Sequence, residues 1–235
     1  MGIDKIEEFK SKIKERMTES ISNKIQFLEE VDNISKAAQV IIESYKKGGK
    51  VISCGNGGSA ADAQHLTAEL VNKFKLDRKP LAAISLTVDT SVLTSWGNDQ
   101  DFSKVFERQV EAHGKPEDVL IAISTSGNSK NVLIACEKAR EMGLKIISLS
   151  GKDGGKLKEL SDVNINSRAQ VTERIQECHL IAYHIICEIV EAEMAELEGG
   201  EGVGEEVELS EREVNLESVN RNINNVQESE SFEMI

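Results

Sequence analysis

Two loops rich in glycine and hydroxyl groups hold the residue types that bind a phosphate group. The first, Gly55–Ser59, follows the apolar run Val51–Cys54 and opens an alanine-rich segment of helical character. Glycine lets the backbone approach a ligand closely, and the free N–H groups at a helix start favour an anion. Such a loop also occurs where a strand merely joins a helix, and neither G-x-G-x-x-G nor G-x-x-x-x-G-K-[ST] is present. The first loop therefore indicates anion binding without identifying the anion.

The second loop, Ser124–Ser129, carries four hydroxyl groups in the order Ser-Thr-Ser-Gly-Asn-Ser. It follows the buried-strand pattern Asp118–Ile123 and precedes a helical pattern at 132–142. Lys130 is the one cation beside it in the sequence, so binding would depend on hydrogen bonds and helix dipoles more than on ion pairs. A helix N-cap is the alternative, but a cap requires only one hydroxyl group. This loop is therefore better explained as a phosphate site.

Two helical segments carry side chains that could transfer protons or bind a metal ion. His65 and Glu69 are four residues apart after the first loop, so they project from one helical face. They form a half-site for a divalent metal such as zinc, with Gln176 and His184 of the last helix as candidate further ligands, and His179 lies near these two. Positions 176 and 184 are about 12 Å apart along a helix. Both can therefore bind one ion only if their side chains lean toward each other or if another subunit supplies one of them. A surface hydrogen bond between His65 and Glu69 is the alternative.

The apolar pattern predicts the elements that position these groups. Strands alternating with helices indicate a parallel sheet covered on both faces, with ligands at the carboxyl ends of the strands. We therefore expect an α/β fold with a doubly wound five-stranded sheet. Strands are predicted at 50–54, 81–86, 119–123, 144–149 and 163–165. Helices are predicted at 3–47, from 59 to about 75, and at 87–96, 103–113, 132–142 and 172–196. A further short helix follows the glycine-rich turn at 151–155 and ends at 160, and a polar turn is predicted at 97–102.

Changes in composition divide the chain into three segments. Residues 1–48 carry a long amphipathic stripe before any strand, which predicts N-terminal helices at an oligomer interface. Residues 49–197 contain all the predicted strands and both loops, and should form one α/β domain. Residues 198–235 are first rich in glycine and then acidic, which predicts a flexible tail.

The overall composition excludes several classes of partner and location. The 235-residue chain has a formal net charge of −13 and 4% aromatic residues, which disfavours nucleic acid and anionic membranes as partners. No segment has the roughly 18 apolar residues that span a bilayer, and the charged N-terminus is unlike a signal peptide, so we expect a cytoplasmic protein. The four cysteines form no C-x-x-C pair and lie in apolar runs, which predicts reduced, buried thiols.

Four motifs, in this order, resemble one protein family. They are Gly-Asn-Gly-Gly-Ser-Ala-Ala-Asp-Ala-Gln-His at 55–65, Ser-Thr-Ser-Gly-Asn-Ser at 124–129, Gly-Lys-Asp-Gly-Gly at 151–155 and Arg-Ile-Gln-Glu-Cys-His at 174–179. Each is modest alone, but the ordered set closely resembles the phosphoheptose isomerases (sedoheptulose 7-phosphate isomerases) of the sugar isomerase (SIS) domain superfamily. The resemblance extends over about residues 5–195 and implies a flavodoxin-like SIS domain.

The resemblance also implies an activity. It implies a homotetramer, with active sites between subunits, that converts sedoheptulose 7-phosphate into D-glycero-D-manno-heptose 7-phosphate through an enediol(ate), the first step of nucleotide-activated heptose synthesis. Glu69 would be the catalytic carboxylate and His184 its acid/base partner. In zinc-containing members the matching ligands of one zinc per site are His65, Glu69, Gln176 and His184. Positions matching substrate contacts are Asn56, Gly57, Ser59, Asn98, Asp99, Ser124, Thr125, Ser126, Ser129, Thr172 and Gln176.

The sequence departs from the family pattern at a few positions and leaves two other functions open. Lys73 stands where some members have Arg, Glu173 stands where some have Asp, and the tail after Glu198 has no counterpart. Proteins of the same fold include a replication-initiation regulator that binds its initiator protein, and a non-catalytic sensor of sugar phosphates is a further alternative. The presence of both Glu69 and His184 favours the enzyme, because an adaptor needs no acid/base pair.

Overall fold

Five parallel strands form a single sheet in the part of the chain that the computed structural model describes, residues 3–197. The strands are β1 (Val51–Gly55), β2 (Ala83–Ser85), β3 (Val119–Ser124), β4 (Lys145–Gly151) and β5 (Val163–Ser167). Their order across the sheet is β2-β1-β3-β4-β5, and every neighbouring pair is parallel. This order is that of a flavodoxin-like, doubly wound sheet, so the predicted fold class is confirmed.

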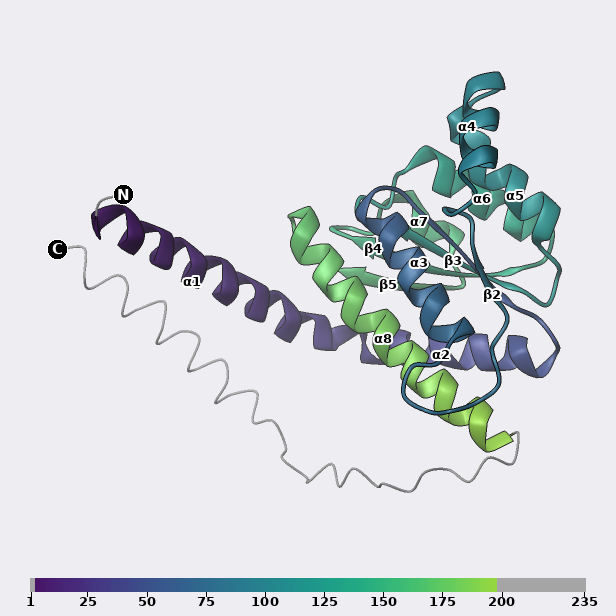
Figure 1. Cartoon of the computed structure of the whole chain (residues 1–235), viewed down its shortest axis with the longest axis horizontal. Helices are drawn as coiled ribbons and strands as arrows, with labels where there is room; N and C mark the ends of the chain where they lie inside the picture. The colour runs from purple at the N-terminus through teal and green to yellow at the C-terminus, as the bar shows by residue number, and fades with distance from the viewer. Residues whose placement is uncertain (1–2, 198–235) are drawn as a thin grey trace. The chain divides into compact units, whose positions relative to one another are not determined.

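Helices cover both faces of the sheet (Figure 1). Helices α2, α3 and α8 pack on one face, and α5, α6 and α7 pack on the other. The helical segments are α1 (Ile3–Gln26), the 3-10 turn η1 (Phe27–Glu30), α2 (Val31–Lys46), α3 (Gly58–Val71), α4 (Thr90–Asp99), the 3-10 turn η2 (Phe102–Lys104), α5 (Val105–His113), α6 (Lys130–Glu141), α7 (Gly155–Leu160) and α8 (Thr172–Leu197).

The sheet has an apolar core on each of its two faces, because successive side chains of a strand point to opposite faces. In β3, Ile121 and Ile123 face the core shared with α2, α3 and α8, whereas Leu120 and Ala122 face the core shared with α5 and α6. All residues of β3 are buried, which is expected for the central strand of a parallel sheet covered on both faces. The sheet is thus a rigid support for the loops that leave its carboxyl edge.

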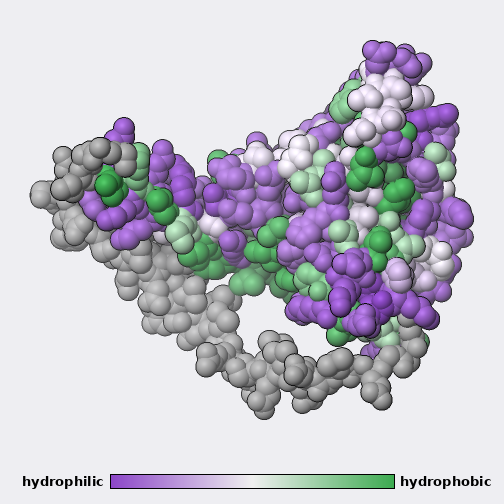
Figure 2. All heavy atoms as spheres, in the orientation of Figure 1, coloured by the Kyte–Doolittle hydropathy of each residue, from purple (hydrophilic) through white to green (hydrophobic). Residues whose placement is uncertain are grey.

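The N-terminal segment contains two helices separated by η1 at Phe27–Glu30. Of the described residues, 26–197 belong to one compact unit and 3–25 to another. In α1, five large apolar side chains are exposed at spacings of three and four, and Figure 2 shows hydrophobic side chains along one side of this helix. These residues are Ile6, Phe9, Ile13, Met17 and Ile21. The oligomer interface expected at 1–48 stays a prediction, and the predicted tail at 198–235 lies outside the described residues.

Several predicted boundaries are wrong, and the strand expected at 81–86 spans only Ala83–Ser85. The helix after the first loop ends at Val71, not near residue 75, because the backbone N–H groups of Phe74 and Lys75 bind the carboxylate of Glu191 instead of continuing the helix. The helix expected at 87–96 begins at Thr90, where the Asp89 carboxylate accepts a hydrogen bond from the N–H of Val92, and it continues to Asp99. The residues expected to start a polar turn at 97–99 are therefore helical.

Two expectations drawn from composition can be compared with the described residues. All four cysteines are free and buried, as predicted. Within residues 3–197, no helix has the length and apolar character that crossing a membrane requires.

Candidate active site

The first loop joins β1 to the start of α3 through a tight glycine turn. Gly57 has a φ of +56°, a conformation that side-chain-bearing residues rarely adopt, and Gly58 begins the helix. A Cβ atom on Gly58 would lie 2.1 Å from Nε2 of Gln176, so the side chain of Gln176 packs directly against this helix start. Ser59 is buried one residue further along α3. The loop therefore brings a helix N-terminus, a serine and the amide of Gln176 together.

The second loop follows β3 and gathers its hydroxyl groups tightly. The Oγ atoms of Ser124 and Ser129 are 2.9 Å apart, and the Oγ atom of Ser126 accepts a hydrogen bond from the N–H of Asn128 at 3.2 Å. Ser129 is the N-cap residue of α6, yet its hydroxyl group makes no capping hydrogen bond and binds Ser124 instead. Helix capping by Ser129 therefore does not account for this cluster of hydroxyl groups.

A reciprocal pair of side-chain hydrogen bonds joins the two loops. Asn56 of the first loop and Asn131 of α6 each donate from Nδ2 to the Oδ1 of the other, at 2.8 Å in both directions. β1 and β3 are neighbours in the sheet, so their carboxyl ends deliver both loops to the same edge. The pairing holds the starts of α3 and α6 in a fixed relation, as one anion site built from two loops requires.

The carboxylate and imidazole groups meet where α3 packs against α8. Nε2 of His65 lies 2.8 Å from Oε1 of Glu69, and Nδ1 of His65 lies 2.9 Å from the hydroxyl group of Tyr183. One side-chain ligand atom from each of His65, Glu69 and His184 lies within 4.8 Å of the others. The rings of His65 and His184 stand edge to face with their centroids 5.0 Å apart. Helices α3 and α8 thus bring together groups that are more than a hundred residues apart in the sequence.

Burial shapes the electrostatics of this cluster. It lowers the pKa of His184 below its ordinary value, and the neighbouring His65 lowers it further, while Glu69 opposes the shift. Burial also raises the pKa of Asp62, one turn before His65, to about 6. The lowered pKa favours the neutral imidazole of His184, which can accept a proton.

The donor set fits a zinc ion. Nε2 of His184 is buried and has no hydrogen-bond partner in the part of the chain described, although a buried ring nitrogen normally has one. Two imidazoles and a carboxylate are one of the ligand sets that hold zinc in catalytic sites. Gln176, the fourth predicted ligand, lies two turns earlier on α8, with its amide against Gly58.

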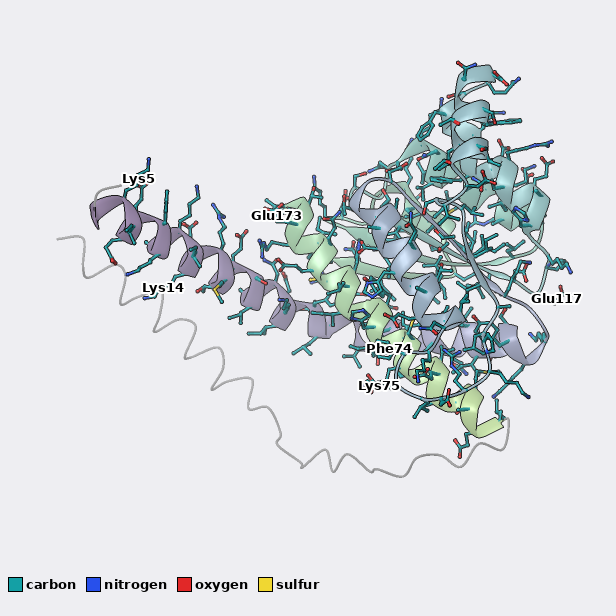
Figure 3. All side chains as sticks on the ribbon, in the orientation of Figure 1. Lys5, Lys14, Phe74, Lys75, Glu117 and Glu173 are labelled. Atoms are coloured by element: carbon teal, nitrogen blue, oxygen red, sulfur yellow. The ribbon has the colours of Figure 1, made fainter. Side chains whose placement is uncertain are left out.

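An aromatic side chain borders the same cluster. Phe74, from the segment that follows α3, has its ring centroid 5.5 Å from that of His184, with the two planes inclined by 32°. Figure 3 shows Phe74 and the adjacent Lys75 beside α8. The ring of Phe74 thus forms one wall around His184.

Three other predicted site residues have exposed side chains. Asn98 and Asp99 are exposed near the end of α4, where Nδ2 of Asn98 donates to Asp99 at 2.8 Å, and Thr172 is exposed at the first position of α8. His179 does not join the cluster, because its Nε2–H donates to the carbonyl of Ser150 in β4 at 2.8 Å. Burial lowers the pKa of His179 to about 4, which fits a neutral structural residue.

Sequence reasoning missed three residues of this region. Asn131, Tyr183 and Phe74 each contact the site through a partner that is distant in the sequence. Asn131 had one local signal, since it lies two residues after the hydroxyl-rich loop. Tyr183 and Phe74 carry no local signal, because only the packing of α3 on α8 reveals their neighbours.

Comparisons with known proteins agree with this geometry. The family model of the SIS domain matches residues 10–151. The phosphoheptose isomerase of Clostridium acetobutylicum is 50% identical over 188 residues, which are 79% of this chain and 96% of the relative. The phosphoheptose isomerase of Helicobacter hepaticus is 55% identical over 163 residues, which are 69% of this chain and 83% of the relative. The solved structure of the phosphoheptose isomerase of Neisseria gonorrhoeae has a TM-score of 0.74 and 41% identity, over 77% of this chain and 98% of that one. The chain therefore belongs to the phosphoheptose isomerase family of SIS-domain proteins.

Proposed function

We propose that this isomerase converts sedoheptulose 7-phosphate into D-glycero-D-manno-heptose 7-phosphate, supplying the first step of nucleotide-activated heptose synthesis. Family membership makes the chain an isomerase of phosphorylated heptoses. The observation that carries the mechanism is the meeting of the Glu69 carboxylate and the His184 imidazole next to His65. Glu69 lies on the helix that starts at the first loop, so this carboxylate and the first loop share one rigid element.

The phosphate group binds at the two loops. Ser124, Ser126 and Ser129 offer neighbouring hydroxyl groups that can reorient to donate to phosphate oxygens. The N-terminal ends of α3 and α6 add free N–H groups and the positive ends of their dipoles. The complete set proposed for substrate contacts includes Asn56, Gly57, Ser59, Thr125 and Gln176, together with Asn98, Asp99 and Thr172.

Glu69 and His184 move the protons of the reaction. The aldose–ketose conversion removes a proton from the carbon beside a carbonyl, forms an enediolate, and returns the proton one carbon along. A single carboxylate can carry that proton, and Glu69 fills this role. Burial lowers the pKa of His184 and so favours its neutral form, which can take a proton from one substrate oxygen and deliver it to the neighbouring oxygen.

A zinc ion would be held by His65, Glu69, Gln176 and His184. The buried, unpartnered Nε2 of His184 supports this proposal. When bound, zinc supplies Lewis-acid polarisation of the carbonyl oxygen. The hydroxyl group of Tyr183 at Nδ1 of His65 fixes the orientation of that ring and leaves Nε2 facing Glu69.

The enzyme works as a cytoplasmic homotetramer. The exposed apolar stripe of α1 supports self-association, because an unpaired stripe of large apolar side chains is unfavourable in water. Four free cysteines support a reducing compartment. The net charge of −13 argues against nucleic acid as a partner.

The test is incubation of the purified protein with sedoheptulose 7-phosphate in D₂O, with added zinc or with chelator. NMR should show exchange of the proton next to the carbonyl together with formation of the aldose. Glu69→Gln is the matched control, since it removes the proton-transfer group with little change in size. Substrate binding without exchange in the wild-type protein would favour a sensor, and neither binding nor exchange would favour an adaptor.

A further inference from the structure

A buried carboxylate on α8 organises the segment that leads out of the active-site helix. Oε1 of Glu191 accepts a hydrogen bond from the N–H of Phe74 at 2.8 Å. Its Oε2 accepts from the N–H groups of Lys75 at 2.6 Å and Leu76 at 3.0 Å. The side chain of Glu191 is 1% exposed. One carboxylate thus binds three consecutive backbone N–H groups of a segment that has no helix or strand of its own.

An arginine in the same segment completes the arrangement. Nε of Arg78 lies 3.1 Å from Oε1 of Glu191, and the side chain of Arg78 is 3% exposed. Its Nη1 donates to the carbonyl of Leu70 at 2.9 Å, and its Nη2 donates to the carbonyl of Glu69 at 3.0 Å. Both carbonyls belong to the last turn of α3, where they lack partners within the helix. Arg78 therefore caps the helix that carries Glu69.

These contacts converge on the two groups of the acid/base pair. Arg78 binds the backbone of Glu69 itself. Glu191 fixes the N–H of Phe74, whose ring packs on the imidazole of His184. The Glu191–Arg78 pair thus binds the backbone of Glu69 and the backbone of Phe74, whose ring lies beside His184. It does not touch the reacting groups themselves.

We propose that the Glu191–Arg78 ion pair is a positioning device that sets the relative placement of Glu69 and His184. The mechanism described above uses neither residue. A solvent-exposed ion pair would be enough to hold residues 74–76 in place, whereas the side chains of Glu191 and Arg78 are buried. A buried pair can be replaced by apolar residues without loss of stability, so stability alone does not explain its chemistry. This inference rests on the proposed function for its kinetic readout.

The matched comparison is Glu191→Gln against Glu188→Gln. Glu188 lies one turn earlier on α8 and pairs with Lys75 of the same segment at 2.6 Å, but both of these side chains are about half exposed. We expect kcat of Glu191→Gln to fall about 100-fold, because a displacement of 1 Å in a catalytic group has an effect of that order. KM should stay within threefold, since the phosphate loops are not touched. Glu188→Gln should retain kcat within twofold.

A spectroscopic readout separates this inference from the isomerase proposal. The chain has four histidines, so ring ¹³C-labelled histidine gives few NMR signals, and that of His184 is assigned with His184→Gln. Loss of the Phe74 wall should shift the His184 signal in Glu191→Gln and leave it unchanged in Glu188→Gln. An inactive wild-type protein would overturn the isomerase proposal while this shift still tests the positioning. An unshifted His184 signal, or an unchanged kcat, in Glu191→Gln would overturn the inference.

A second variant keeps the test decisive if Glu191→Gln fails to fold. Arg78→Met combined with Glu191→Leu removes both charges and leaves no buried ion unpaired. Hydrogen exchange of residues 74–76 should accelerate in this double variant, because the acceptor of their N–H groups is gone, and kcat should fall as in Glu191→Gln. Faster exchange with wild-type kcat would show that the pair anchors a segment without positioning the catalytic groups.

Discussion

Replacement of Tyr183 by Phe tests whether the hydroxyl group behind His65 serves the metal ligands. Tyr183 is fully buried, and its hydroxyl group lies 2.9 Å from Nδ1 of His65. The side chain of His65 is 44% exposed, so water can hydrate Nδ1 after the substitution. The loss of stability should therefore be only that of one hydrogen bond, about 1 kcal/mol. This corresponds to a fall in Tm of about 2–4 °C for a chain of this size.

The effect on zinc should be larger than the effect on stability. Partners that orient a ligating imidazole typically change metal affinity by about 10- to 100-fold. We expect the Kd for zinc of Tyr183→Phe to rise by that factor, because His65 can rotate away from Glu69 once Nδ1 loses its partner. Competition with a chromophoric chelator measures this Kd, and calorimetry measures Tm on the same samples.

The second tyrosine of the chain provides the control. The hydroxyl group of Tyr45 donates to the carbonyl of Ala82 at 3.2 Å, outside the histidine cluster. Tyr45→Phe should lower Tm by a similar amount and leave the Kd for zinc unchanged. The reasoning is refuted if Tyr183→Phe binds zinc within twofold of the wild type, or if Tyr45→Phe weakens binding equally. A wild-type protein that binds no zinc would contradict the zinc proposal itself.

Three further changes probe separate parts of the molecule. Glu69→Gln should abolish turnover, because the proton carrier is lost. Sugar-phosphate affinity, measured by calorimetry, should stay within about tenfold, because the phosphate loops remain. A normal rate would remove Glu69 from this role. Asn131→Ala breaks the reciprocal hydrogen bonds with Asn56. Steady-state kinetics should then show KM raised about tenfold and kcat little changed. An unchanged KM would show that the two loops keep their relative positions without these hydrogen bonds. His179 has a folded-state pKa of about 4, below its unfolded value, so its contribution to stability is complete above about pH 6.5 and is lost as the pH falls toward 4. Urea unfolding of His179→Phe should accordingly show a smaller loss of stability between pH 7 and pH 4.5 than the wild type, and an equal loss would locate the acid sensitivity elsewhere.

Local patterns predicted those parts of the molecule that depend on neighbours in the sequence. The spacing of His65 and Glu69 placed both on one helical face, and their side chains do meet at 2.8 Å. The two loops were found because each lies between an apolar run and a helical pattern. The end of α3 was misplaced, because its stop signal is a carboxylate on α8 more than a hundred residues away. Pairings such as Asn56 with Asn131 likewise depend on which strands become neighbours.

The geometry of α8 explains why its two histidines have different surroundings. His179 and His184 are five residues apart, which on an α-helix rotates them by about 140° around the axis. One therefore reaches the carbonyl of Ser150 in the sheet, while the other faces His65 on α3. Glu191 follows His184 by seven residues, which is nearly two full turns and leaves it only about 20° away. The same side of α8 thus presents the imidazole to the cluster and the carboxylate to residues 74–76, so the two sites contacted by this helix are linked by a single rigid element.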